Sequence, residues 1–278
     1  MNSGVLHIGL LAVVCGAFLL VACADKDKAV YVERQADDLY NNAMDLLEAK
    51  NYEKAAGLFD EVERQHPYSV WATKGQLMAA YALYQSNQYD EAIVALDRFV
   101  QLHPSNKDTP YALYLKALSY YEQISDVARD QKMTELAMKT LNELTTRYPG
   151  SKYARDAKIK IVLTHSHLAG KEMWVGRYYL NQGNYLAAIN RFKSVIDNYQ
   201  TTTHVPEALH RLTEAYLAIG VEEEARRTAA VLGHNYPGSE WYVDTYALFG
   251  GGDVPRGDVT VKGEKDGAKR KKPWYKFW

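Results

Sequence analysis

The chain has 278 residues, 47% of them apolar and 24% charged, with a formal net charge of −1 at pH 7. This length and apolar share are ample for a packed core in one large or two ordinary domains. A charge balance so close to zero gives no indication of a nucleic-acid partner.

Residues 1–22 have the composition of a secretory signal peptide. Their apolar stretch of about 14 residues carries no Asp, Glu, Lys or Arg and is too short to span a bilayer comfortably. The sequence "LVAC" at 20–23 resembles the bacterial lipobox, which implies that Cys23 is acylated and becomes the new N-terminus. Ala24 in the next position implies sorting to the outer membrane. We therefore predict a lipid anchor followed by a lipidated linker over 23–34, with a plain secreted or membrane-anchored chain as the alternative.

From residue 35 to 249 the sequence consists of five copies of one helix-turn-helix unit. Apolar residues recur at helical spacing, and no Asn-Gly hairpin signal occurs. Each unit has an alanine twelve residues before its closing position, which is proline in four of the five units. These alanines are Ala55, Ala92, Ala137, Ala188 and Ala225. The spacing resembles the tetratricopeptide repeat and predicts an all-α superhelical solenoid in which stacked repeats share a continuous core.

Two repeats depart from the common spacing. The third carries eight extra residues between Ala117 and Ala137, around "ISDVARDQ". The fourth begins with an insertion that keeps helical periodicity without a proline through "ARDAKIKIVLTHSHLAGKEMWVGRYYL". We expect this segment to form one long helix of about 27 residues.

No pattern of catalytic or cofactor-binding residues emerges from the sequence, and we predict neither an enzyme nor a bound cofactor. The "PGS" sequences that begin at Pro149 and Pro237 are expected to be turns between repeats, not nucleophile elbows. His165 and His167 suggest a metal site, but residues two apart on a helix point to different faces. We therefore expect solvated histidines and no metal.

Tyrosine is unusually common, with 22 copies. If Ala43, Ala80 and Ala117 are the points where paired helices cross closely, helical spacing places a set of large residues on the concave surface. The predicted peptide groove comprises Tyr40, Leu77, Tyr81, Tyr84, Tyr111, Tyr114 and Tyr121. Tyrosine suits a surface that accepts varied peptides, because it combines a wide apolar ring with one polar tip. The alternative is that these rings belong to the core.

The last segment, 250–278, begins as a glycine-rich linker and ends in a basic, aromatic tail. Residues 262–278 include seven basic and two acidic side chains, and Trp274, Tyr275, Phe277 and Trp278 follow the basic run. Such a tail can contact a membrane interface or an acidic surface of a partner or of the chain's own body. Occupation of the tyrosine groove by the tail, or no role at all, are the remaining alternatives.

Several phrases of the repeat region resemble the BamD family of outer-membrane lipoproteins, which belongs to the β-barrel assembly machinery. They include "FDEVERQHPYS", "YPGSKYARDAK" and "YYLNQGNYLAAINRFKSVIDNY". The resemblance covers residues from about 35 to 248 and leaves the signal and the tail outside it. It implies a non-enzymatic scaffold that is lipid-anchored in the outer membrane on its periplasmic face.

The same resemblance implies particular partners. They are the periplasmic (POTRA) domain of the insertase BamA, the other lipoproteins of the assembly complex, and unfolded outer-membrane proteins. Arg191 aligns with an arginine that the family uses toward the last periplasmic domain of the insertase. A solvated helical arginine is the alternative at this position. A tetratricopeptide lipoprotein that serves as an adaptor for cell-wall or envelope regulators is the alternative for the whole chain.

Overall fold

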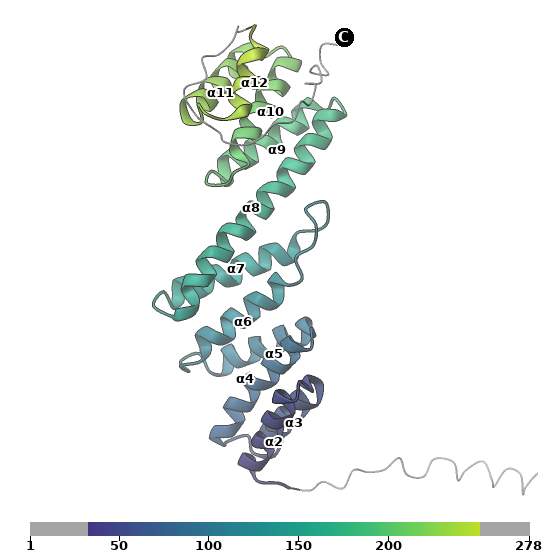
Figure 1. The fold of residues 1–278 in the computed structure, drawn as a ribbon, viewed down its shortest axis with the longest axis vertical. Helices are drawn as coiled ribbons and strands as arrows, with labels where there is room; N and C mark the ends of the chain where they lie inside the picture. The colour runs from purple at the N-terminus through teal and green to yellow at the C-terminus, as the bar shows by residue number, and fades with distance from the viewer. Residues whose placement is uncertain (1–32, 251–278) are drawn as a thin grey trace, which may run out of the picture.

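The computed structural model describes residues 33–250, which form eleven α-helices and no strand. The helices are α2 (Ala36–Glu48), α3 (Tyr52–Gln65), α4 (Val70–Gln85), α5 (Tyr89–Leu102), α6 (Thr109–Tyr121), α7 (Lys132–Arg147), α8 (Lys152–Asn181), α9 (Tyr185–Asn198), α10 (Val205–Ala218), α11 (Glu222–Asn235) and α12 (Glu240–Leu248). They stack as consecutive antiparallel pairs along one elongated molecule, with α2 at one end and α12 at the other (Figure 1). This arrangement confirms the predicted all-α tetratricopeptide solenoid.

The small residues of the repeat pattern lie where paired helices approach closely. All five repeat alanines, from Ala55 to Ala225, are 0% exposed, as are the large residues that follow four positions later in the first four repeats. Those large residues are Phe59, Leu96, Leu141 and Phe192. Burial of each stabilises the stack by about 1.5–3 kcal/mol relative to an exposed side chain. The periodicity seen in the sequence is therefore the periodicity of the core.

Serine residues cap the N-termini of three helices, α4, α8 and α12. Ser69, Ser151 and Ser239 stand two residues after a proline, and each accepts a hydrogen bond from a backbone N–H in the first turn of the next helix, at 3.0–3.2 Å. These bonds satisfy N–H groups that have no partner within the helix. The two "PGS" sequences are helix caps, so the expectation that they form turns between repeats is confirmed.

The fourth repeat opens with the longest helix of the described chain. α8 spans Lys152–Asn181 and has 30 residues, which confirms the predicted long helix. Its N-terminal half packs through Ala157 against α6 and α7, whereas its C-terminal half packs through Met173 against α9 and α10. Gly176 leaves room for Phe192, because a Cβ atom there would lie 2.5 Å from the phenyl ring. One continuous helix thus belongs to both halves of the solenoid.

The insertion in the third repeat lies between α6 and α7 and contacts the middle of α8. Lys171 on α8 donates hydrogen bonds to the carbonyl oxygens of Ala128 and Arg129, at 3.0 and 3.1 Å. Gln131, at the end of the insertion, lies 2.8 Å from the Nδ1 atom of His167. The insertion therefore braces the long helix at the point where one half of the solenoid passes into the other.

Within residues 33–250, no helix is both long enough and apolar enough to cross a membrane.

Candidate functional site

Tyrosines from α4, α6 and α8, each the first helix of its repeat, meet on one surface of the N-terminal half. Tyr81 and Tyr84 on α4 and Tyr111 on α6 pack over the same buried cluster, and all three are half-buried. Tyr153 on α8 continues the row, with its ring centroid 5.2 Å from Tyr111 and 5.3 Å from Tyr114. We call Tyr81, Tyr84, Tyr111, Tyr114 and Tyr153 the tyrosine cluster. Its partial exposure leaves aromatic surface available for a ligand.

The hydroxyl groups of Tyr84 and Tyr114 are held as neutral hydrogen-bond donors. Tyr114 donates to Asp156 at 2.5 Å, and Tyr84 lies 3.5 Å from the Glu122 carboxylate. Burial, together with Asp156, raises the pKa of Tyr114 well above its usual range. Burial and the nearby Glu122 carboxylate raise the pKa of Tyr84 to about 12. At neutral pH the surface therefore offers rings and protonated hydroxyls, and its negative charge comes only from the carboxylates beside them.

The other predicted groove residues lie elsewhere. Tyr40 belongs to the first repeat, where its ring contacts Phe59 and Trp71 with centroid distances of 5.3 and 4.9 Å. Tyr121 lies on α6 beneath Lys160, whose ammonium group is 4.9 Å from the ring centroid. The prediction that Leu77 lines the groove was wrong, because only 8% of this residue is exposed and it packs inside the core. It offers little surface to a ligand.

Tyr153 was missed because it lies outside the repeat positions used for the prediction. A signal for it nevertheless exists in the sequence. Three repeats carry an aromatic residue four positions after the closing proline: Trp71, Tyr153 and Trp241. Each of these rings contacts the first helix of the repeat before it, always at the same repeat position. That position is occupied by Tyr40, Tyr114 and His210, respectively.

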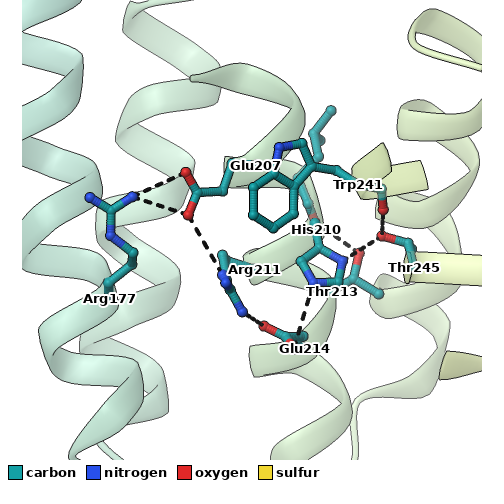
Figure 2. Close-up of polar contacts among 9 residues, drawn as sticks. Arg177, Glu207, His210, Arg211, Thr213, Glu214, Trp241 and Thr245 are labelled. Carbon is teal, nitrogen blue, oxygen red and sulfur yellow. Dashed lines mark hydrogen bonds and ion pairs between the residues drawn. The ribbon is translucent and has the colours of Figure 1, made fainter. Parts of the chain in front are cut away.

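The equivalent surface of the C-terminal half is built from charged groups (Figure 2). Arg177 on α8 donates to both oxygens of Glu207 on α10, each at 3.0 Å. Arg211 donates to Glu214 at 2.7 Å and lies with its guanidinium 5.3 Å from the Trp241 ring. Arg177 occupies the repeat position of Tyr81, and Glu207 that of Tyr111. At these two repeat positions the side chains therefore change from aromatic in the N-terminal half to charged in the C-terminal half.

His210 ties α12 to this charged network. Its Nδ1 atom lies 2.7 Å from Thr245 Oγ1, and that hydroxyl donates to the carbonyl oxygen of Trp241 at 2.7 Å. Because the Thr245 proton is used in this way, Nδ1–H must donate to Thr245. Burial lowers the pKa of His210 to about 4, so the ring is neutral at pH 7. The contact is structural, and it fixes the last helix on the solenoid.

Arg191, the predicted partner-binding residue, lies on the surface of α9. Its Nη1 atom is 3.3 and 3.2 Å from the two carboxylate oxygens of Glu172 on α8. The arginine side chain is 45% exposed. An exposed ion pair of this kind contributes about 0–1 kcal/mol, so Glu172 holds the Arg191 side chain only weakly.

The predicted histidine positions differ in part from expectation. His165 and His167 do point to different elements, but both are half-buried instead of solvated. The His165 ring lies 4.8 Å from that of Tyr199, and His167 contacts Gln131 of the insertion. Among residues 33–250, no group of three or more His, Cys, Asp and Glu side chains is placed to hold a metal ion. Cys23 and the tail from residue 251 lie outside the described residues.

Comparison with known proteins identifies the family. The family model described as "YfiO: Outer membrane lipoprotein" matches residues 32–232. The chain is 50% identical to an "Outer membrane protein assembly factor BamD" of Caulobacter vibrioides, over 94% of this chain and 85% of the relative. Proteins of the same description from Rickettsia prowazekii and Neisseria meningitidis are 46% and 37% identical, covering 88% and 83% of this chain and 95% and 92% of the relatives. The chain therefore belongs to the BamD family of outer membrane lipoproteins.

Proposed function

We propose that this chain is a non-enzymatic scaffold for the assembly of outer-membrane proteins, and that its tyrosine cluster binds segments of unfolded substrates. The observation that carries the proposal is the row of half-buried rings shared by α4, α6 and α8. Such a row offers apolar contact at low entropic cost to a chain whose sequence varies. The hydroxyls of Tyr84 and Tyr114 already donate to Glu122 and Asp156, so their oxygen atoms can accept hydrogen bonds from backbone N–H groups of an extended peptide.

We further propose that the chain is held at the periplasmic face of the outer membrane by lipid on Cys23. Its C-terminal repeats would bind the periplasmic (POTRA) domain of BamA, with Arg191 exchanging Glu172 for a carboxylate of that partner. A guanidinium group suits this exchange because it pairs with carboxylates in a bidentate geometry. Other lipoproteins of the assembly complex would share the same scaffold.

The substrate proposal is tested with peptides that end in an aromatic residue. The double variant Tyr81→Ala, Tyr84→Ala should weaken peptide binding about tenfold or more, because two anchoring rings worth about 1 kcal/mol each are lost. Tyr68→Ala is the matched control, since Tyr68 is fully exposed on the turn before α4 and lies outside the cluster. Helicity and thermal stability should stay close to those of the unchanged chain. Unchanged binding by the double variant would refute a role for the cluster.

The partner proposal is tested by copurification from detergent-solubilised membranes. Arg191→Glu should reduce recovery of the large partner, and a reversed charge on the partner should restore it. Glu223→Arg, which reverses an exposed charge on α11, is a control for general electrostatic effects. Recovery of cell-wall enzymes in place of a barrel protein with periplasmic domains would favour the adaptor alternative.

A further inference from the structure

An apolar pocket lies between α11 and α12 at the C-terminal end of the solenoid. Its volume is about 270 Å³, and it is lined by Ala229, Ala230 and Gly233 from α11 and by Tyr242, Thr245, Tyr246 and Phe249 from α12 or the residue after it. Cavities of about 150 Å³ with apolar walls already bind a benzene ring. The pocket is therefore large enough for one aromatic side chain.

One wall of the pocket is formed by a residue that is smaller than its counterparts in the other repeats. Ala229 occupies the position of Phe59, Leu96, Leu141 and Phe192, which are 0% exposed in the first four repeats. In the fourth repeat the large side chain, Phe192, lies against Gly176 of the same helix pair. In the fifth repeat the alanine stands in the wall of the pocket, which remains open between α11 and α12.

The walls of the pocket favour an aromatic occupant. Tyr242 and Tyr246 lie with ring centroids 6.3 Å apart, and Tyr246 is 42% exposed. The pocket residue Phe249 also lies under a cation, with the guanidinium of Arg226 5.2 Å from its ring centroid. An entering ring can therefore make edge-to-face contacts with the two tyrosines.

The chain's own C-terminal segment has the chemistry and the starting point to supply that ring. It leaves the described structure at Gly250, directly after the pocket residue Phe249, and it ends in "WYKFW" 28 residues later. A segment tethered at the rim reaches the pocket at an effective concentration in the millimolar range. In contrast, α4 and α6, which carry four of the five residues of the tyrosine cluster, lie in the other half of the solenoid (Figure 1).

Charge also favours this contact. Residues 222–248, which form α11 and α12, hold five carboxylates and two arginines, a net charge of −3, whereas residues 262–278 have a net charge of +5. Glu240 and Asp244 are exposed and lie four residues apart on α12, and neither has an ion-pair partner within residues 33–250. Like charges at this spacing repel each other, and Lys269–Lys272 would relieve the repulsion.

We propose that the pocket between α11 and α12 is a docking site for the aromatic C-terminal end of the same chain. One ring of Trp274–Trp278 fills the space opposite Ala229, and the preceding basic residues lie beside the carboxylates of α11 and α12. The contact completes the packing of the last repeat and covers apolar surface at the exposed end of the solenoid.

Disulfide cross-linking in the full mature chain tests the proposal. Ala230→Cys places a thiol at the exposed rim of the pocket, and Lys276→Cys places one between the terminal rings without removing any of them. Under mild oxidation this pair should form an intramolecular disulfide at least about fivefold faster than the control pair Arg227→Cys, Lys276→Cys. Arg227 is exposed on the same helix as Ala230 but does not line the pocket. A thiol there is therefore equally accessible to the tail but does not face the pocket.

Two further changes identify what holds the tail. Ala229→Leu restores the side chain found in the second and third repeats and should reduce cross-linking to the rate of the control pair. Replacing the four terminal rings by serine should do the same, and this change leaves every side chain of the described helices in place. Circular dichroism verifies the fold of the Ala229→Leu chain.

Equal cross-linking rates for the pocket pair and the control pair would overturn the proposal. A disulfide found only between two chains would also overturn it, because the occupant would then be the tail of a second copy. Persistence of rapid cross-linking after loss of all four rings would show that charge alone brings the tail to this end, and would refute insertion of a ring.

Discussion

Replacing Gly176 by alanine should destabilise the solenoid, although the same change normally stabilises a helix. Alanine is favoured over glycine in a helix interior by about 1 kcal/mol. At Gly176, however, the new Cβ atom would lie 2.5 Å from Cε1 of Phe192, whereas ordinary contacts begin near 3.4 Å. Phe192 is 0% exposed and lies within the core cluster, so its ring must shift against packed neighbours to make room. Overpacking of this kind costs about 1–3 kcal/mol, so we expect a net loss of about 1 kcal/mol.

Two companion variants isolate the clash. Gly57→Ala changes a glycine inside α3 with nothing within 4 Å of the new atom, and it should raise the free energy of unfolding by about 1 kcal/mol. In a Phe192→Leu background, Gly176→Ala should also become stabilising, because leucine accompanies alanine at these positions in the second and third repeats. Urea unfolding followed by circular dichroism measures these variants, the Phe192→Leu background and the unchanged chain, five chains in all, with the slope against urea checked for constancy. If Gly176→Ala stabilises the unchanged chain as much as Gly57→Ala does, the packing described here is wrong.

Three other outcomes follow from the structure. Leu77→Ala should lower the free energy of unfolding by about 2–5 kcal/mol in denaturant titrations, because it leaves a core cavity, yet the affinity of the folded chain for peptide should be unchanged. Lowering the pH through the window from 6.5 to about 4 should destabilise the chain, because His210 binds a proton only when unfolded. The raised pKa of Glu214 acts in the opposite direction, so the test compares thermal unfolding of the unchanged chain with that of His210→Gln, which should lose less stability on acidification. Mass spectrometry of the mature N-terminal peptide should find acyl chains on Cys23 and none in a Cys23→Ser chain; an unmodified Cys23 in the mature protein would contradict the anchor.

The repeat architecture could be predicted from the sequence because its cause is local. Two helices that cross closely need a small residue at the crossing and a large residue one turn later to fill the space between them. The spacing of Ala188 and Phe192 is therefore enough to predict that both are buried in the core. The long helix was equally visible, since nothing in its sequence interrupts the periodicity. These features depend on contacts within one helix pair.

The contacts between repeats could not be predicted in the same way. The pairing of Arg177 with Glu207, or of His210 with Thr245, depends on how one helix pair is rotated against the next. Spacing within a repeat does not fix that rotation. For the same reason Leu77 was placed on the surface, although the small Ala112 of the next repeat lets it pack into the core.

The continuity of α8 sets a fixed distance within the molecule. At about 1.5 Å per residue, its 30 residues form a rod about 45 Å long. Tyr153 stands at one end of this rod and Arg177 near the other, and Lys171 and His167 anchor the insertion midway along it. α8 contains no proline and no break between these points. The tyrosine cluster and the charged end are therefore attached to one continuous helix, which sets the separation between them.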